Sequence, residues 1–493
     1  MNINKDTQSQ YFIGVDVGSA SVRAGLFDDQ GQRLSFAVND IQVFRGVHSH
    51  DVVEQSSQDI WNAVCRSVKQ VLQQAPPHVP ATSIKGLGFD ATCSMVVIDH
   101  NGQPLNVSPR PTMDNNTNTL HDIIMWMDHR ATKETSLINS TKDPALMYVG
   151  GEVSVEMELP KALWLKNNLP QTYKDAWRLF DLSDYLVWRA TGVDAVGICT
   201  LSCKWNYLSH EGRFSETLLR AVDLEDILDK IPTKVIGVGQ PVGTLSRGAA
   251  HELGLSEEVV VASGLIDAHA GGLAMIGQSP DSSLALISGT SNCHMLVSRD
   301  PLMVPGVWGP YLSAMIPDLW LSEGDHHHGN RSPHSNPHSR AVVMGQTLEQ
   351  GWRALARLYL ATLQSIAYGT RQIIEAIEQA GGTVGKVVLC GGASKNRIWM
   401  REYANITNRA IGLMVDEDAV TLGAAIVAAV ACGSYTSIQE ACSRMAKLGA
   451  SVEPKTTIAT KSFHDLKYQV YLKMYNYQLE VMDTINKHEC HPS

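Results

Sequence analysis

The hydrophobic runs at the start of the chain predict a small antiparallel meander. Residues 11–18 are apolar except for Asp16 near the end of the run. A second apolar run follows over residues 21–27, a polar turn over 28–31, and a third run over 33–38. Short apolar runs separated by Gly, Ser and Asp are typical of strands joined by tight turns. A carboxylate is therefore expected at the first turn of a sheet.

Apolar residues recur at helical spacing further along the chain. The pattern predicts helices over residues 57–74, 348–380 and 463–487, and the segment 126–130 is expected to open another. The aromatic residues of the last helix are interpreted as a packing face. The buried stripe of the helix over 348–380 is expected to consist of Leu355, Leu358, Leu363, Ile366, Ile373 and Ile377.

The second half of the chain repeats the pattern of the first. Residues 283–298 predict a strand, a turn of small residues and a second strand. Residues 287–291 resemble 15–21 in this hydroxyl-rich turn, and residues 84–90 form another apolar run that ends in a carboxylate. This weak internal repeat indicates two related α/β domains that face one cleft.

Composition and charge exclude several classes of protein. The chain has 493 residues and a formal net charge of -10, which argues against a non-specific nucleic-acid or membrane binder. The apolar run over 419–432 is too short to span a bilayer. The nine cysteines form no CxxC pair and lie mostly in apolar contexts, and residues 1–10 carry no apolar signal-peptide core. We therefore expect a cytoplasmic protein.

Asp267 lies between an apolar run and a series of small residues that ends at Gly277. A carboxylate among apolar residues is costly to bury unless it has a function, so a catalytic base is one interpretation. A helix N-cap is the other, because Asp is a preferred N-cap residue. The segment alone supports both equally.

Three turns of small residues have the composition of phosphate-binding loops: Gly18–Ser21, Gly289–Ser291 and Gly391–Gly392. Turns without bulky side chains expose backbone N–H groups to phosphate oxygens. Singly, such a turn is most often an ordinary connection, and none is a Walker A motif. Together with Asp16, suited to hold Mg²⁺ through water, and Asp267, suited to accept a proton, they predict phosphoryl transfer.

Five segments taken together resemble the FGGY carbohydrate kinases: Asp16–Ser19, Trp126–Arg130, Gly264–His269, Ser288–Ser291 and Cys390–Asn396. The resemblance covers about residues 10 to 450 in the family's order. It implies an α/β fold of two ribonuclease H-like domains, of the actin/hexokinase/Hsp70 ATPase type, around a central cleft. The implied division is a sugar-binding domain over residues 1–250 and an ATP-binding domain over 251–493.

The resemblance also implies the reaction and its residues. Residues 86–94 and 328–333 look most like the D-ribulokinase, or pentulokinase, branch, which implies ATP- and Mg²⁺-dependent phosphorylation of the C5 hydroxyl of a pentulose, D-ribulose first. Asp267 becomes the catalytic base. The implied nucleotide and phosphate positions are Asp16, Gly18, Ser19, Ser21, Gly289, Thr290, Ser291, Gly391, Gly392 and Asn396. The implied sugar positions are Thr92, Cys93, Asp128, Lys204, Asp267 and Glu323.

Three of the sugar positions also have a structural interpretation. Without the family, Lys204 is an exposed lysine and Cys93 a small buried hydrophobic residue. Asp128 is equally well a helix cap or the ion-pair partner of Arg130.

One stretch departs from the family pattern. Family members continue a Leu-x-Glu-Gly segment with a long helical insert, whereas here Leu321–Gly324 runs directly into Asp325–Gly329. We therefore expect the second domain to be shortened near 324–328, which bears on where Glu323 lies. The same stretch begins a possible Zn²⁺ ligand set, but its prolines favour an extended loop; the set is Asp325, His326, His327, His328, His334 and His338.

Alternative functions stay open at this point. The substrate can be another ketose or polyol, such as D-xylulose, L-ribulose or ribitol. The shortened domain can also make the protein a catalytically impaired member of the fold, and an actin-like or Hsp70-like scaffold ATPase is the least favoured alternative. The expected partner is a small sugar, with no nucleic acid and no membrane, and a homodimer is left open.

Overall fold

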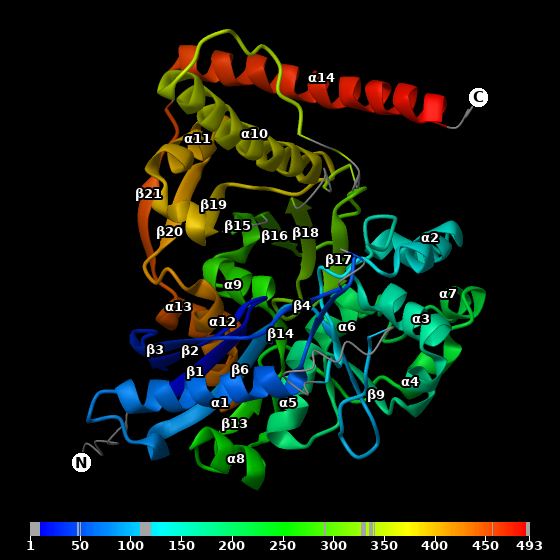
Figure 1. Cartoon of the computed structure of the whole chain (residues 1–493). Coiled ribbons are helices and arrows are strands. Elements are labelled where there is room, and N and C mark those ends of the chain that lie inside the picture. Colours follow the sequence, from blue (N-terminus) through cyan, green and yellow to red (C-terminus); the bar gives the residue numbers. More distant parts are fainter. Residues whose placement is uncertain are drawn as a thin grey trace.

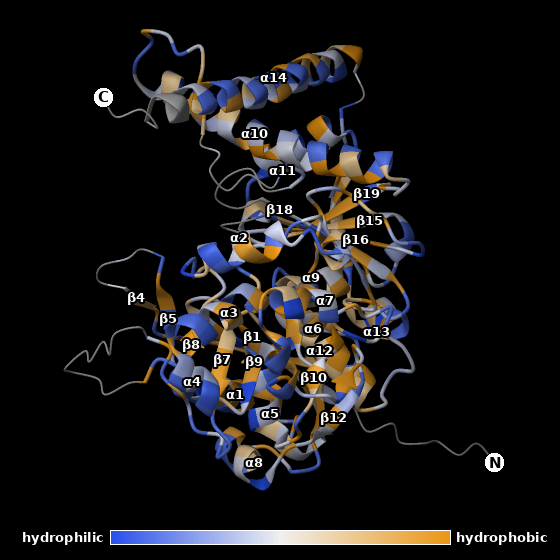
Figure 2. Cartoon of the chain, turned by 90° about the vertical axis from the view of Figure 1, so that its right-hand side faces the viewer, coloured by the Kyte–Doolittle hydropathy of each residue, from blue (hydrophilic) through white to orange (hydrophobic). Residues whose placement is uncertain are grey.

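The computed structural model describes residues 10–46, 49, 51–108, 120–289, 292–326, 332–334, 339, 341–455 and 457–489. Two large sheets form the centres of two lobes, with α9 (Asp267–Ile276) and α12 (Ala419–Ala431) between them (Figure 1). Hydrophobic residues are concentrated in the strands and in α12, as Figure 2 shows. The expected α/β fold of two related domains is confirmed.

The first sheet contains the predicted meander. The strand β1 pairs antiparallel with β2, which pairs antiparallel with β3, while β6 lies parallel to β1 on its other side. The sheet continues through β13 to β12, and β14 also pairs with β6. The strands are β1 (Tyr11–Val17), β2 (Ser21–Asp28), β3 (Arg33–Asp40), β6 (Ile84–Ala91), β12 (Pro241–Thr244), β13 (Val260–Ala262) and β14 (Leu265–Ile266).

The second sheet repeats this arrangement. A meander of β15, β16 and β18 is followed by the parallel neighbour β19, as β6 follows β1 in the first sheet. The internal repeat expected from the small-residue turns is thus present in the strand order. The strands are β15 (Ser283–Ser288), β16 (Asn292–Ser298), β17 (Trp308–Leu312), β18 (Trp320–His326), β19 (Lys386–Cys390), β20 (Ala410–Met414) and β21 (Leu448–Val452).

A smaller sheet and several helices extend the first lobe. This sheet has the strand order β4-β5-β8-β7-β9: β4 (Phe44–Arg45), β5 (Val53–Gln55), β8 (Ile123–Ile124), β7 (Met95–Ile98) and β9 (Arg178–Asp181). A separate pair is formed by β10 (Val196–Gly197) and β11 (Val235–Ile236). The helices are α1 (Ser57–Gln74), α2 (Thr132–Ser140), α3 (Glu158–Asn168), α4 (Pro170–Asp175), α5 (Leu182–Thr191), α6 (Ile198–Lys204), α7 (Glu216–Ala221) and α8 (Arg247–Leu253).

The division expected at residue 250 does not coincide with the change of sheet. Strands β13 and β14 lie beyond residue 250 and still pair with β6. The helix α12, from the second half of the chain, also packs against β1 and β6. It approaches them closely, because a Cβ added at Gly14 or Gly88 would lie 1.9 or 2.0 Å from a carbonyl oxygen of α12 or the turn before it.

Three helices cover the outer side of the second sheet: α10 (Trp352–Gln379), α11 (Arg397–Thr407) and α14 (Ile458–Glu489). The helix α13 (Ile438–Met445) instead packs on α12. The expected helix over 348–380 begins four residues later, and the terminal helix extends beyond 463–487 at both ends. Rings of α14 do form a packing face, since Tyr468 and Tyr471 contact Tyr368 of α10.

Two expectations for local structure were wrong. Leu355 and Leu358 are 67% and 39% exposed, because no element of the described chain covers the first turns of α10, whereas Leu363, Ile373 and Ile377 are buried as expected. The segment 126–130 forms turns, and the helix α2 begins only at Thr132. There the Asp128 carboxylate accepts hydrogen bonds from the backbone of Val53 and of Arg130, which fixes a turn instead of a helix start.

Candidate active site

Asp16 and Asp90 lie side by side at the edge of the first sheet. They are partners in the parallel register of β1 and β6, and their side chains are 2% and 0% exposed. Arg23 of β2 donates to Asp16 Oδ2 at 2.8 Å. Burial raises the pKa of Asp16 to about 7, against the effect of Arg23, and raises that of Asp90 well above its usual range. Two carboxyl groups in contact without water favour a bound proton or a cation between them.

The first small-residue turn joins β1 to β2 beside this pair. The Gly18 N–H donates to Ser21 O at 3.0 Å and closes the turn. Ser19 is tied to the smaller sheet, since its Oγ accepts a hydrogen bond from Trp126 Nε1 and its carbonyl one from Gln55 Nε2. The segment Trp126–Arg130 therefore supports the turn from outside.

Asp267 is the first residue of α9 and follows β14 directly. Because β14 pairs with β6 at Asp90, the start of α9 lies at the same sheet edge as Asp16. Its Oδ1 accepts a hydrogen bond from the Ala268 N–H at 2.7 Å, while Ile266 occupies the N-cap position. Burial raises the pKa of the Asp267 carboxyl, opposed by Ala268 N–H, His269, Lys204 and Arg23. A capping role in the strict sense is thus taken by another residue.

The turns of the second domain come together at one place. A Cβ at Gly391 would lie 2.4 Å from Ser288 O, and Gly391 has φ +91°, so the turn after β19 abuts the end of β15 and requires glycine there. Gly289 follows Ser288 directly, and Thr290 and Ser291 lie outside the described residues. Asn396 caps α11 by accepting from the backbone of Ile398 and Trp399.

The sugar-side candidates from four elements also converge. Lys204, at the end of α6, is 4% exposed, so its interpretation as an exposed lysine was wrong. Its Nζ lies 4.8 Å from the ring centroid of Trp308 on β17. Burial alone lowers the pKa of Lys204, but the surrounding acidic groups Cys93 and Glu323 hold it above its usual value. Thr92 and Cys93 follow β6, and Thr92 Oγ1 lies 3.4 Å from Ser94 Oγ.

His269 connects Glu323 to the first domain. Its Nε2 lies 3.2 Å from Glu323 Oε2 on β18, and its Nδ1 lies 3.1 Å from Cys199 Sγ on α6. Against burial, Lys204 and His269 lower the pKa of Glu323 to about 2, and Cys199 and Glu323 raise that of His269 to about 10. Glu323 is therefore well placed despite the abrupt sequence that follows it.

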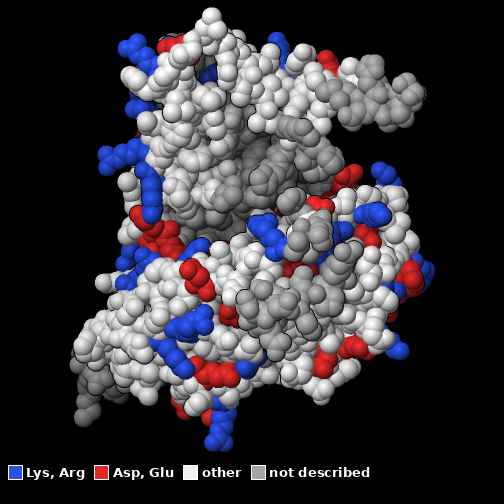
Figure 3. Space-filling model, viewed as in Figure 1, with Lys and Arg blue, Asp and Glu red and all other residues white. Residues whose placement is uncertain are grey.

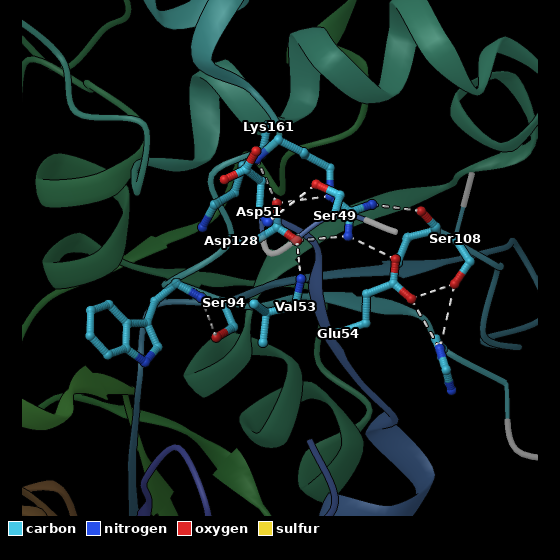
Figure 4. A network of polar contacts seen from close by, with 12 residues as sticks. Ser49, Asp51, Val53, Glu54, Ser94, Ser108, Asp128 and Lys161 are labelled. Carbon is cyan, nitrogen blue, oxygen red and sulfur yellow. Dashed lines mark hydrogen bonds and ion pairs between the residues drawn. The ribbon is translucent and has the colours of Figure 1, made fainter. Parts of the chain in front are cut away.

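Asp128 belongs to a buried network beside the sugar-side candidates (Figure 4). Arg130 bridges Asp128 and Glu54, with an Nη2 distance of 2.7 Å to each carboxylate. Glu54 also accepts from Ser108 and contacts His121. Asp128 Oδ2 further accepts the Val53 N–H at 2.6 Å. Both oxygens of Asp128 are thus engaged within the protein, so direct sugar binding by this residue stays a prediction.

The histidine-rich stretch gives no metal centre that the structure can describe. His327, His328 and His338 lie outside the described residues, and the side chains of Asp325 and His326 are not described. His334 contacts Gln372 and stacks on Tyr475 of α14. Over the described ranges, no group of three His, Cys, Asp or Glu side chains is arranged to hold a metal ion directly.

Surface and membrane expectations can be compared with the described chain. Acidic and basic residues interleave over the face in Figure 3, without a large area of one sign. Among the described helices, none has the length and apolarity needed to cross a bilayer.

Sequence reasoning missed three residues of this region. Asp90 ended a predicted strand, which is the signal that had drawn attention to Asp16, yet it was assigned no role. His269 stood in the Asp267 segment without a role, and Trp308 gave no signal in the sequence. Each is recognised only when elements distant in sequence come together.

The family models identify the chain. Residues 11–108 and 110–274 match the N-terminal domain of the FGGY family of carbohydrate kinases, and residues 284–327 and 324–432 match its C-terminal domain. The chain belongs to the FGGY carbohydrate kinases. It is therefore a phosphotransferase family member with a sugar as acceptor.

Related proteins span nearly the whole chain. It is 40% identical to a human FGGY carbohydrate kinase domain-containing protein over 564 residues, covering 99% of this chain and 100% of the relative. It is 32% identical to the D-ribulokinase YDR109C of Saccharomyces cerevisiae, over 94% of this chain and 77% of that protein. Since the human alignment is longer than the 493 residues here, that relative has several dozen residues without a counterpart. The C-terminal family match is split at 324–327, where the join was noted.

Solved structures show the same fold. A xyloylose kinase from Brucella ovis has a TM-score of 0.81 at 20% identity, covering 96% of this chain and all of that one. A xylulose kinase from Rhodospirillum rubrum has a TM-score of 0.79 at 16% identity, over 96% and 99% of the two chains. At these identities the likeness concerns the fold alone.

Proposed function

We propose that the protein transfers the γ-phosphoryl group of ATP to the C5 hydroxyl of a pentulose, with D-ribulose as the first candidate. One observation carries the proposal. The Asp267 carboxyl has Lys204 and His269, which contacts Glu323, as electrostatic neighbours on one side, and Arg23 of the first hairpin on the other. A base between a group that can hold hydroxyls and a turn that can hold phosphate has the arrangement that phosphoryl transfer requires.

The side chains of the first domain and β18 supply the sugar site in this proposal. Lys204 donates to the sugar oxygens and Glu323 accepts from its hydroxyls, while Thr92 and Cys93 lie against the sugar. Asp267 accepts the proton of the C5 hydroxyl as that oxygen attacks phosphorus. Its raised pKa favours proton acceptance, since a more basic carboxylate is the better general base.

The small-residue turns supply the nucleotide site in this proposal. Backbone N–H groups of Gly18–Ser21 and Gly289–Ser291 hold the phosphates, and Gly391, Gly392 and Asn396 line the adenosine site. Closure of the two domains on the substrates excludes water, which limits hydrolysis of ATP.

The residues present fit a Mg²⁺ ion held through water. Asp16, Asp90, Asp267 and Asp418 act electrostatically on one another, and the cation paired with Asp16 is Arg23. Phosphate groups would add further negative charge, so a divalent cation is needed for balance. Asp16 would hold it through water, and the bound ion would neutralise charge on the transferring phosphoryl group.

Relatives support the choice of sugar. The proteins called D-ribulokinase and ribulokinase are 32% and 27% identical to this chain. Solved structures called xylulose kinase share the fold, so D-xylulose, L-ribulose and ribitol are the competing substrates. A cytoplasmic location is also proposed, on the ground that the cysteines of the described part are free.

A substrate panel tests the proposal. Purified protein is given Mg-ATP with D-ribulose, D-xylulose, L-ribulose or ribitol, and ADP release is followed by a coupled assay. We expect the highest kcat/KM with D-ribulose and little ADP release without sugar. Asp267→Asn serves as the control that removes only the base. A higher kcat/KM with another sugar would replace the substrate, and sugar-independent ADP release would indicate a scaffold ATPase.

An impaired member of the fold gives a different result. Absence of ADP release with every sugar, while Mg-ATP still raises the melting temperature, would show that the nucleotide site forms without a functional cleft. The observation that favours this alternative is the exposed start of α10 beside the shortened segment.

A further inference from the structure

Asp90 occupies a place that the proposed reaction has not yet used. It is the residue of β6 opposite Asp16 of β1, and Leu265 of β14, two residues before Asp267, is its partner on the other side. The three strands are parallel, so their carboxyl ends meet at one edge of the sheet. Asp90 thus lies between the two aspartates assigned from the sequence.

The Asp90 carboxyl has no donor of its own. The residue is fully buried, and within the described ranges neither Oδ1 nor Oδ2 accepts a hydrogen bond from a protein donor. Buried carboxylates are normally hydrogen-bonded or paired, as Asp184 is with Thr200 and the Gly197 N–H. Instead, Asp90 lies against Asp16, and Asp267 and Asp418 act on it with the same charge.

Direct binding of a metal by these groups alone is not what the geometry favours. No three His, Cys, Asp or Glu side chains in the described part of the chain form a metal-ligand set. Mg²⁺ keeps several of its waters and is usually held by one or two carboxylates. Water ligands of such an ion are hydrogen-bond donors, which is what the two oxygens of Asp90 lack.

We propose that Asp90 is a second metal-side carboxylate, which accepts hydrogen bonds from the water ligands of the divalent cation next to Asp16. The inference rests on the proposed function, because the cation belongs to the ATP site. Asp90 is then a positioning residue: it holds the hydrated ion, and it touches neither the sugar nor the transferred phosphoryl group.

Binding of Mn²⁺ in the presence of ADP tests this role without catalysis. Mn²⁺ replaces Mg²⁺ as the probe, and free Mn²⁺ is measured by electron paramagnetic resonance during titration. We expect Asp90→Asn to weaken Mn²⁺ binding to the ADP complex by tenfold or more, because an amide accepts fewer hydrogen bonds from water. Binding of ADP alone, with EDTA present, is expected to stay unchanged.

Asp122→Asn is the matched control. Asp122 is also fully buried with one oxygen, Oδ2, that lacks a donor in the described chain, and its Oδ1 accepts from the Ser57 N–H. The control variant is expected to bind Mn²⁺ as the unsubstituted protein does. Asp90→Ser, which leaves room for water, gives a second test if Asp90→Asn does not fold.

The outcomes separate this inference from the proposed function. Mn²⁺ affinity in Asp90→Asn or Asp90→Ser equal to that of the unsubstituted protein would overturn the role of Asp90. Failure of every sugar in the kinase panel, with the Mn²⁺ effect of Asp90 intact, would overturn the proposed reaction and leave this role standing. If Mn²⁺ does not bind the unsubstituted protein with ADP, the inference is wrong in its premise.

Discussion

His269 Nε2 lies 3.2 Å from Glu323 Oε2, which joins the helix that begins with Asp267 to a strand of the second sheet. Both side chains are buried, and Cys199 Sγ lies 3.1 Å from the other ring nitrogen. One imidazole thus connects the proposed base, the proposed sugar ligand and α6, whose last residue is Lys204. Its charge makes the orientation of Glu323 depend on residues from both halves of the chain.

We expect His269→Gln to weaken use of the sugar. Gln keeps a hydrogen-bond donor near Glu323 but not the positive charge, so the pKa of Glu323 rises and its orientation is less fixed. A hydrogen bond to a charged group contributes about 1.5–3 kcal/mol, which corresponds to a loss of kcat/KM of roughly 10- to 150-fold. Steady-state kinetics at varied sugar concentration measures this loss.

The pH profile distinguishes this role from a general loss of stability. In His269→Gln, an acid limb is expected to move upward in the plot of kcat/KM against pH. His464→Gln is the control, since His464 is a buried histidine bonded to Tyr368 on the outer helices. The same pH profile in both variants would argue against a specific effect on Glu323.

Asp267→Asn is expected to remove most of the activity. The amide cannot accept the proton of the attacking hydroxyl, and general-base catalysis contributes about 10²–10⁴-fold. Its carbonyl oxygen can still accept the Ala268 N–H, so folding and the binding of ATP should be retained. Sugar-dependent ADP release gives the rate, and calorimetric titration gives the affinity for ATP. Activity within tenfold of the unsubstituted protein would show that another group is the base.

Lys204→Met is expected to raise the KM for the sugar with little change in ATP affinity. Met fills a similar volume beside Trp308 but lacks the ammonium, whose Nζ lies 4.8 Å from the ring centroid. The buried group Glu323 loses a cation, so its pKa rises as well. Lys230→Met is the control, since Lys230 makes the same type of contact with Tyr173, also at 4.8 Å. An unchanged KM in Lys204→Met would place the sugar elsewhere.

The sequence carried the outline of the site because carboxylates within apolar runs are conspicuous. Asp16 and Asp267 were both found in this way, and the small-residue turns pointed to phosphate. Asp90 showed the same pattern, but its meaning depends on the parallel pairing of β1 with β6, about 70 residues apart along the chain. Local periodicity carries no information on which distant strands pair.

Burial was the other property that the sequence could not supply. Lys204 is covered because α6, β17 and β18 meet around it, and a short helix pattern does not predict such a contact. Conversely, Leu355 and Leu358 follow a helical stripe that predicts burial, yet the described chain brings nothing against them. The position of the stripe was correct, and the missing partner lies where relatives have additional residues.

Gly423→Ala is expected to separate the two central helices. A Cβ at this position would lie 1.9 Å from Ala270 O of α9, so α12 and α9 could not keep their present distance. The same helix also packs on β1 and β6, which carry Asp16 and Asp90, so the shift would affect all three aspartates. Overpacking of this kind lowers stability by about 1–3 kcal/mol.

Thermal unfolding and kinase activity measure the effect of Gly423→Ala. Gly248→Ala is the matched control, because Gly248 lies in the helix α8 and an added Cβ there meets no atom within 4 Å. The control is expected to be stabilised by about 0.5–1 kcal/mol. Equal melting temperatures in the two variants would contradict the close packing of α9 on α12.

Asp122 is expected to make stability fall as the pH rises from about 4 to 7. Burial raises its pKa from 3.8 to about 7, against the hydrogen bond from Ser57. Between these values the unfolded chain releases a proton that the native protein keeps. The unfolded state therefore binds fewer protons, and the free energy of unfolding decreases with pH by about 1.4 kcal/mol per unit for this group.

Asp122→Asn removes this contribution, so its free energy of unfolding should decline less steeply over the same interval. Urea unfolding at pH 4.5, 5.5 and 6.5 gives the slopes. Asp99→Asn provides the control of opposite sign: backbone hydrogen bonds lower the pKa of the exposed Asp99, so its contribution grows with rising pH. Identical slopes for Asp122→Asn and the unsubstituted protein would mean that Asp122 is ionised in the folded state, with a cation or water at its second oxygen.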